Sequence, residues 1–241
     1  MEKAKPVGTS FASHYKFSAT NNPKSTDEEH LNHMKVVSYS QAMGSLMYLM
    51  TSTRPDLSYA TSMVSRYMAN PYMENPGRRH WEAVKWILRY LCSSKEAKVL
   101  YRQNEPSNDE VYGYVNADYA GDLDKRHSLS GYVFLLGNNL ISWKATLQHV
   151  VALSTIEAEF IALSEVVKEK SAVSQQTKHI DIKYYFIRQE IEKGKVEIVK
   201  IHTSNNATDM LTKTVPLNKL GEYLDLLGFE LPKKGLLKSA Q

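Results

Sequence analysis

The chain has 241 residues, and its 42% apolar content can fill the core of one large or two small domains. A net charge of +4 and a pI near 8.9 are compatible with a polyanionic partner but are weak evidence for one. The single cysteine, Cys92, excludes an internal disulfide framework and a cysteine-based zinc site. No apolar run approaches eighteen residues and the N-terminus lacks a secretory core, so we expect an intracellular protein, cytoplasmic or nuclear, without a membrane partner. No feature indicates a small-molecule substrate.

The first 96 residues divide by composition into two parts. Residues 1–37 are rich in Ser, Thr, Asn, Lys and Glu, which predicts a leader that is mostly extended or mobile. Residues 38–96 are expected to form a helical segment, because apolar residues recur at helical steps between breaks marked by proline. The expected helices are Tyr39–Ser52, Arg54–Asn70 and Arg78–Leu91.

The three expected helices differ in their apolar faces. Tyr39–Ser52 is apolar on more than one side, which suggests burial between neighbours, whereas Arg54–Asn70 has one apolar face and Pro55 in its first turn. The third helix mixes aromatic and basic residues, so it is either an amphipathic core helix or a nucleic-acid platform. Its spacing alone favours the amphipathic helix. The apolar stripe is Trp81, Val84, Leu88 and Leu91, and the platform would use Trp81, Trp86, Tyr90 and neighbouring Arg and Lys.

Residues 97–228 change to short β-rich runs followed by helices, which predicts a mixed α/β unit with a tail at 229–241. Ser154 or Thr155 can cap the helix that follows the strands, and acidic residues in its first turn suit the helix dipole. The expected strands are Val99–Tyr101, Tyr112–Asn116, Tyr132–Leu136, Leu140–Trp143, Val150–Leu153 and Val196–His202. The later expected helices are Lys178–Lys193, a short one starting near Asn206–Asp209, and Pro216–Leu227.

The strands and the first helix of this unit carry a specific pattern of acidic residues. The first strand carries Gly113-Tyr114-Val115-Asn116-Ala117-Asp118, and the helix carries Glu157 and Glu159. With these residues, the segment 111–165 closely resembles the ribonuclease H domain of copia-type retrotransposon Pol polyproteins. The helical segment resembles the thumb and connection helices that follow the polymerase palm in the same family. No Tyr-x-Asp-Asp motif occurs, so we expect no polymerase activity. The resemblance covers about residues 5–228. It implies an N-terminal helical segment followed by a ribonuclease H-like mixed sheet with helices.

The resemblance implies hydrolysis of the RNA strand of an RNA–DNA hybrid by two Mg²⁺ ions held by four carboxylates. The first carboxylate position falls on Asn116, where the family has aspartate. Asp118 points to the same face but lies about 7 Å further along the strand, so we expect it to be a poor substitute. The second position matches Glu159 or Glu157, of which we favour Glu159, and the fourth matches Asp209.

The third carboxylate position has no counterpart, because Val167–Lys170 leads directly into Ser171–His179. A strand, its loops and a helix need about thirty residues at ordinary element lengths, so we infer an internal deletion near residue 170 that truncates the sheet. The loss would leave one edge of Tyr112–Asn116 unpaired. We therefore expect Val196–His202 to pair with that edge and to carry Asp209 toward Asn116 and Glu159.

Several of these residues also have a purely structural interpretation. Glu159 can be a solvated first-turn glutamate and Asp209 a helix cap, each about as probable as a ligand from the pattern alone. His179 and His202 are more often surface histidines than metal ligands. The loop of residues 122–128 is explained by solvation, although Lys125 and Arg126 are placed to touch a phosphate backbone.

Three functions follow from these observations. The chain is a degenerate ribonuclease H-like remnant without turnover, an active Mg²⁺-dependent hybrid nuclease with an incomplete ligand set, or a non-catalytic module that binds RNA–DNA hybrid or other nucleic acid by charge and shape. Two altered ligand positions favour the first.

Overall fold

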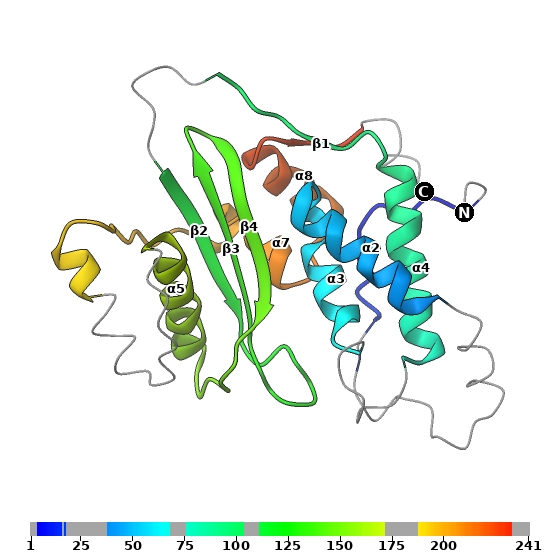
Figure 1. Cartoon of the computed structure of the whole chain (residues 1–241), viewed down its shortest axis with the longest axis horizontal. Helices are drawn as coiled ribbons and strands as arrows, with labels where there is room; N and C mark the ends of the chain where they lie inside the picture. Colours follow the sequence, from blue (N-terminus) through cyan, green and yellow to red (C-terminus); the bar gives the residue numbers. More distant parts are fainter. Residues whose placement is uncertain are drawn as a thin grey trace.

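The structure is a computed structural model that describes residues 4–15, 17, 38–67, 76–103, 111–171 and 188–232. It confirms a mixed α/β fold in which helices from the first half of the chain lie beside an antiparallel sheet from the second half (Figure 1). Among the described residues, no helix is long and apolar enough to span a membrane.

The helical segment has one hydrophobic core. Four elements surround it: α2 (Tyr39–Ser52), the 3₁₀ turn η2 (Pro55–Leu57), α3 (Ser58–Ser65) and α4 (Arg78–Ser93). α2 buries one face only, since Met47 and Tyr48 are exposed, so the expectation of burial on several sides was wrong. α3 ends earlier than expected, and residues 68–70 lie outside the described residues. The fully buried side chains of this core include Met43, Leu57, Val64, Val84, Ile87 and Tyr90.

Part of the predicted leader packs on this core. Phe11 and Phe17 are buried against the helices, and the Trp86 indole N–H donates to the carbonyl of Thr9 at 2.9 Å. The composition of residues 1–37 did not indicate these contacts, because three aromatic residues among many polar ones give no periodic signal. The remaining leader residues lie outside the described ranges.

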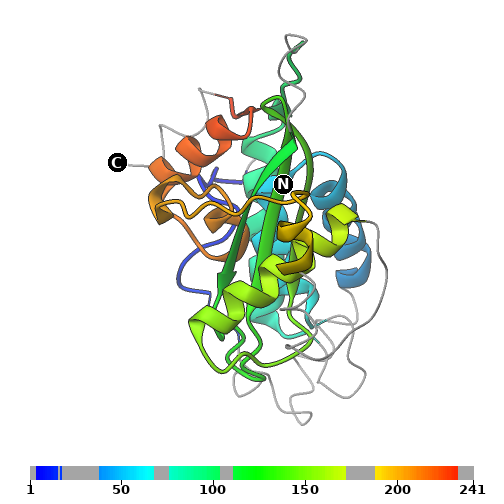
Figure 2. The ribbon, with the colours of Figure 1, turned by 90° about the vertical axis from the view of Figure 1, so that its left-hand side faces the viewer.

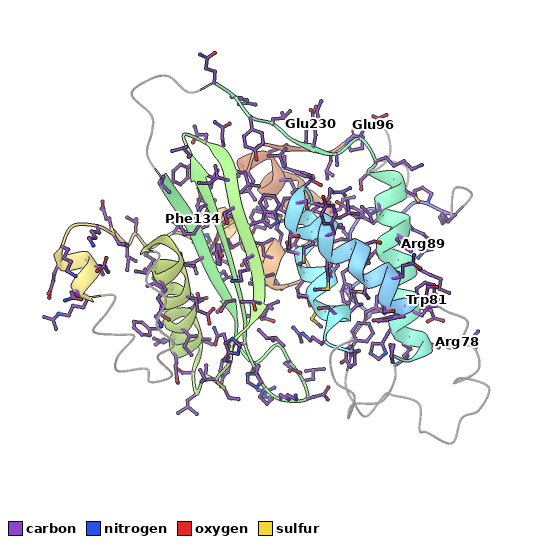
Figure 3. The ribbon with its side chains drawn as sticks, viewed as in Figure 1. Arg78, Trp81, Arg89, Glu96, Phe134 and Glu230 are labelled. Carbon is purple, nitrogen blue, oxygen red and sulfur yellow. The ribbon has the colours of Figure 1, made fainter. Side chains whose placement is uncertain are left out.

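α4 is an amphipathic helix whose aromatic residues are already in use. The core face of α4 lies beside the predicted apolar stripe and shares only Val84 with it. The other three residues of that stripe are partly buried at the margin of the core. The buried residues of α4 are His80, Ala83, Val84, Ile87 and Tyr90. Arg89 stacks over the Trp86 ring at 4.7 Å, and Trp81 packs against the core. Figure 3 shows Arg78, Trp81 and Arg89 along α4, on the side of the molecule away from the sheet. The structure therefore agrees with the amphipathic interpretation.

The second half of the described chain is built on a three-stranded antiparallel sheet. Its strands are β2 (Val111–Asp118), β3 (Leu129–Leu136) and β4 (Asn139–Leu147), in the order β2-β3-β4. A separate two-stranded sheet pairs β1 (Lys98–Val99) with β5 (Phe229–Glu230). Three of the predicted runs are thus confirmed as longer strands, and β1 is shorter than expected.

Helices cover both faces of the three-stranded sheet. α5 (Thr155–Ser171) packs on one face, and α7 (Asp209–Thr212) and α8 (Leu217–Leu226) lie toward the other, as Figures 1 and 2 show. Alternate β2 residues follow this division: Tyr112 and Tyr114 pack with the α7 and α8 side, and Ala117 packs with the α5 side. At Gly131 of β3, a Cβ atom would lie 2.7 Å from Thr212 Cγ2, so glycine is what lets α7 approach the sheet next to Asn116.

Two strand predictions were wrong. Val150–Leu153 forms an irregular connection between β4 and α5, and Val196–His202 forms no strand and does not pair with β2. Short β-branched runs favour strands only where a partner edge supplies hydrogen bonds, so composition alone misled both assignments. Residues 188–192 form a short helical turn, while the rest of the expected helix Lys178–Lys193 falls outside the described residues.

Candidate functional site

The centre of the candidate site is a contact between Asn116 on β2 and Asp209 at the start of α7. The Asn116 side-chain amide donates to Asp209 Oδ1 at 2.7 Å and to Thr212 Oγ1 at 2.9 Å. Asp209 is only 4% exposed. The expectation that Asp209 approaches Asn116 is confirmed, although Val196–His202 does not carry it there as a strand.

Lys213 neutralises the second oxygen of Asp209. Its ammonium lies 2.9 Å from Asp209 Oδ2, one helical turn further along the chain. Both oxygens of this carboxylate are therefore engaged by nitrogen donors of the chain itself. Lys213 could have been found in the sequence from its i,i+4 spacing to Asp209, a standard helical ion-pair distance.

Asp118 lies at the end of β2, on the same face as Asn116. Burial raises its pKa, the charges of Lys213 and Arg66 lower it, and the nearby Asp209 raises it. The net result is an elevated pKa, so this carboxyl gives up its proton less readily than an exposed aspartate. Arg66 comes from the end of α3, and no local sequence spacing links it to a strand residue 52 positions later.

Glu159 reaches the same region from α5. Burial raises the pKa of its carboxyl, a hydrogen bond from the Ala117 backbone N–H lowers it, and the charge of Asp209 raises it. Its net pKa is elevated. Glu159 is nonetheless partly open to solvent, so its environment is wetter than that of Asp209.

Glu157 makes different contacts from Glu159. Its carboxylate accepts from the Leu153 backbone N–H at 2.8 Å, and the Ser154 hydroxyl accepts from the Glu157 N–H at 3.1 Å. This is a reciprocal capping arrangement at the N-terminus of α5. Ser154 and Glu157 therefore cap α5, whereas Glu159 is the glutamate whose pKa the charge of Asp209 helps to raise.

The remaining candidates lie apart from this cluster. Lys125 and Arg126 are exposed in the turn between β2 and β3, which is closed by a hydrogen bond from the Arg126 N–H to the Asp122 carbonyl at 2.9 Å. His202 contacts the Ser204 hydroxyl at 2.8 Å in an exposed turn, as expected for a surface histidine. His179 lies outside the described residues.

The arrangement does not fit a pair of Mg²⁺ ions. Mg²⁺ needs several unengaged oxygen ligands in near-octahedral geometry, whereas the Asn116 amide group presents N–H rather than oxygen to Asp209. Within the described ranges, no group of three or more His, Cys, Asp or Glu side chains could hold a metal ion. The neutral Asn116 amide instead donates a hydrogen bond to one Asp209 oxygen, and the Lys213 ammonium supplies the positive charge beside the other.

The chain is 40% identical over 260 aligned positions to the retrovirus-related Pol polyprotein from transposon TNT 1-94 of Nicotiana tabacum, covering 95% of this chain and 19% of that protein. It is 29% identical to the corresponding polyprotein from transposon RE1 of Arabidopsis thaliana, covering 95% and 17%. The chain belongs to the family of copia-type retrotransposon Pol polyproteins and corresponds to a fragment of one.

A shorter relative shares part of the chain. The secreted RxLR effector protein 161 of Plasmopara viticola is 39% identical over 145 residues, which cover 60% of this chain and 97% of that protein. The chain spans less than one fifth of the length of the Pol polyproteins that it matches. No protein-family model matches the chain, and no solved structure matches it.

The alignments also show how many residues this chain lacks. The tobacco alignment runs over 260 positions, but 95% of 241 residues is about 229, so about 31 positions lie opposite gaps in this chain. The same comparison for transposon RE1, 261 positions against about 229 residues, leaves about 32. Two relatives from different plants therefore each have about thirty residues that lie opposite gaps in this chain.

Proposed function

We propose that this retrotransposon-derived fragment is a ribonuclease H-like remnant that binds no catalytic metal pair and does not turn over. The single observation that carries the proposal is the hydrogen bond from the Asn116 amide to Asp209. A carboxylate at position 116 would repel Asp209 unless cations lay between them, whereas the amide stabilises Asp209 directly. The site is thus stable without metal.

Two further observations support the proposal. Lys213 pairs with the remaining oxygen of Asp209, so a metal ion would have to displace an existing ion pair. About thirty aligned positions are missing from this chain, which agrees in size with the loss of a strand, its loops and a helix near residue 170. A third carboxylate would have come from that region. A cytoplasmic or nuclear location stays a prediction.

The test is cleavage of a labelled RNA–DNA hybrid by the full chain in the presence of Mg²⁺ or Mn²⁺. We expect no metal-dependent cleavage above background. Asn116→Asp should not produce turnover either, because the third carboxylate is still missing. If the chain cleaves the hybrid and cleavage disappears in both Asp209→Ala and Glu159→Ala, the chain is an active nuclease and the proposal fails.

Non-catalytic nucleic-acid binding is a second candidate, favoured by the exposed pair Lys125 and Arg126. These side chains project from the turn that follows Asp118, and neither has an ion-pair partner among the described residues. Binding through them would be weak and steeply salt-dependent, because release of counterions would drive it. Loss of one such contact should reduce the salt slope by about 1.

The binding test compares Lys125→Ala and Arg126→Ala with a control, Lys98→Ala, in titrations of hybrid duplex at several salt concentrations. Lys98 is exposed and pairs with Glu230 in the separate two-stranded sheet. A reduced slope in the first two variants alone would support binding through the turn. Salt-independent binding, or no binding at low salt, would eliminate this candidate.

A further inference from the structure

β2 has one edge that the described sheet leaves open. Its other edge pairs with β3 over all eight residues. At the open edge, the Val115 carbonyl accepts from the Asn206 side chain at 2.9 Å, and the Ala117 N–H donates to Glu159. Because main-chain groups alternate between the two edges of an antiparallel strand, those of Val111 and Gly113 face the same open edge.

Within the part of the chain that the structure describes, these main-chain groups have no partner outside the sheet. Among the described residues, no hydrogen bond beyond the β2–β3 ladder reaches the N–H or C=O of Val111 or Gly113. An open edge of this kind is a template for pairing with another strand. The polar ends of Asn206 and Glu159 already occupy one end of the edge, so the open part runs from Val111 to Val115.

A cavity of about 670 Å³ lies along this open part. One wall is the edge of β2, a second is the α5 face with Leu163, Val166 and Val167, and the third is the irregular segment of residues 194–201. Figure 2 shows that irregular segment, drawn in gold, crossing near α5 and the sheet. Exposed apolar side chains of the segment, Ile198 and Ile201, also line the cavity.

The dimensions and chemistry of this groove suit an extended peptide. Five residues of β2 border it, and at about 3.3 Å per residue they present about 17 Å of edge, the length of a short strand. The occupant would hydrogen-bond to β2 along one side and would place apolar residues against α5 at alternate positions. This is the pattern of β-strand addition, in which the main chain provides affinity and alternate side chains provide specificity.

The relatives contain residues that this chain lacks. Each plant Pol polyprotein has about thirty residues that lie opposite gaps in this chain. We propose that the groove at the open edge of β2 accepts, in trans, an extended strand with the chemistry of that missing segment, supplied by a copia-type Pol polypeptide. The interaction is independent of hybrid cleavage and does not depend on the proposed loss of turnover.

The experiment uses the full chain and a fluorescent synthetic peptide with the tobacco polyprotein sequence that lies opposite the gaps. Fluorescence anisotropy should show saturable binding, and hydrogen exchange should show added protection of the Val111, Gly113 and Val115 amides. Val166→Asp, in the α5 wall, should weaken binding at least tenfold. The matched control Ile156→Asp, on the same helix but 81% exposed and outside the groove, should leave binding unchanged.

A modified peptide and a sedimentation measurement test how the peptide binds and whether a second copy of the chain fills the groove. A peptide N-methylated at alternate residues cannot form the strand hydrogen bonds and should not bind, which tests the mode without changing the protein. Absence of peptide binding, equal binding of the N-methylated peptide, or equal affinity of Val166→Asp would overturn the proposal. A dimer of the chain alone, detected by sedimentation and abolished by Val166→Asp, would also overturn it, because a second copy would then fill the groove.

Discussion

Two polar clusters of opposite character lie among the described residues. In the helical segment, Arg54 pairs with Asp56 at 2.6 Å, and their side chains are 7% and 0% exposed. Asp56 also accepts from the Tyr90 hydroxyl, and Arg54 donates to Ser94. Every charge in this first cluster has a partner of opposite sign, and water is excluded, so its role is structural.

The second cluster, around Asn116 and Asp209, is only partly closed. Lys213 is 43% exposed, and Asp118 and Glu159 add negative charge whose cost appears as elevated pKa values. The comparison shows that the second cluster gathers more carboxyl groups than cationic partners and stays open to solvent on one side, which is the arrangement that the proposed function builds on.

The largest expected effect is on the closed cluster. Asp56→Asn leaves the Arg54 charge buried without its counter-charge, which should lower the free energy of unfolding by about 3–5 kcal/mol. Denaturant titration measures this loss. Glu82→Gln is the control, because its exposed pair with Arg78 should contribute less than about 0.5 kcal/mol. Equal effects of the two changes would contradict the structural role of the first cluster.

Asp209→Ala tests the half-open cluster. It removes the acceptor of the Asn116 amide and the partner of Lys213, so we expect a loss of about 1–3 kcal/mol. The loss should be smaller than for Asp56→Asn, because the Lys213 ammonium can turn to solvent. Asp225→Ala, an exposed change on α8, serves as the control in the same denaturant titration. A loss larger than that of Asp56→Asn would show that the second cluster is the more tightly closed one.

Asn116→Asp tests the link between this cluster and metal. It places two carboxylates at hydrogen-bonding distance, so we expect a loss of about 1–2 kcal/mol at neutral pH without metal. Mg²⁺ should restore part of this stability in the variant and should leave the melting temperature of the unaltered chain unchanged. Thermal melts with and without Mg²⁺ measure both effects. A stabilisation of the unaltered chain by Mg²⁺ would refute our view of the site.

The smallest effect is expected for Glu159→Gln. The pKa of Glu159 is raised in the folded state, so the folded chain binds the proton more tightly than the unfolded chain. Proton binding by Glu159 therefore stabilises the folded chain at acid pH. This stabilisation is lost as the pH rises from the pKa of Glu159 in the unfolded chain through its raised pKa in the folded chain. The variant should therefore melt slightly higher than the unaltered chain at pH 7 and equally at pH 4. If Glu159→Gln melted higher than the unaltered chain at pH 4 only, the pKa of Glu159 would be lowered on folding and the prediction would be wrong.

Much of the fold could be predicted from the sequence because it depends on local periodicity. The bounds of Tyr39–Ser52 were predicted as observed, and the strands around Asn116 and Val133 were placed correctly. Capping chemistry, which acts over three residues, predicted Ser154 or Thr155 as the cap of α5, and the structure has Ser154 in that role. The candidate residues Asn116, Glu159 and Asp209 came from the resemblance to the copia-type family rather than from spacing.

Tertiary structure alone decided the rest. Val196–His202 has the composition of a strand, but a strand exists only where another edge supplies hydrogen bonds, and this segment lies across a groove from β2 instead. The pairing of Asn116 with Asp209 joins residues 93 positions apart, and Arg66 reaches Asp118 from another part of the chain. The sequence determined which residue types stand at the site, because type is a local property. Their partners and charge states depended on packing, because burial and distance are set by the whole fold.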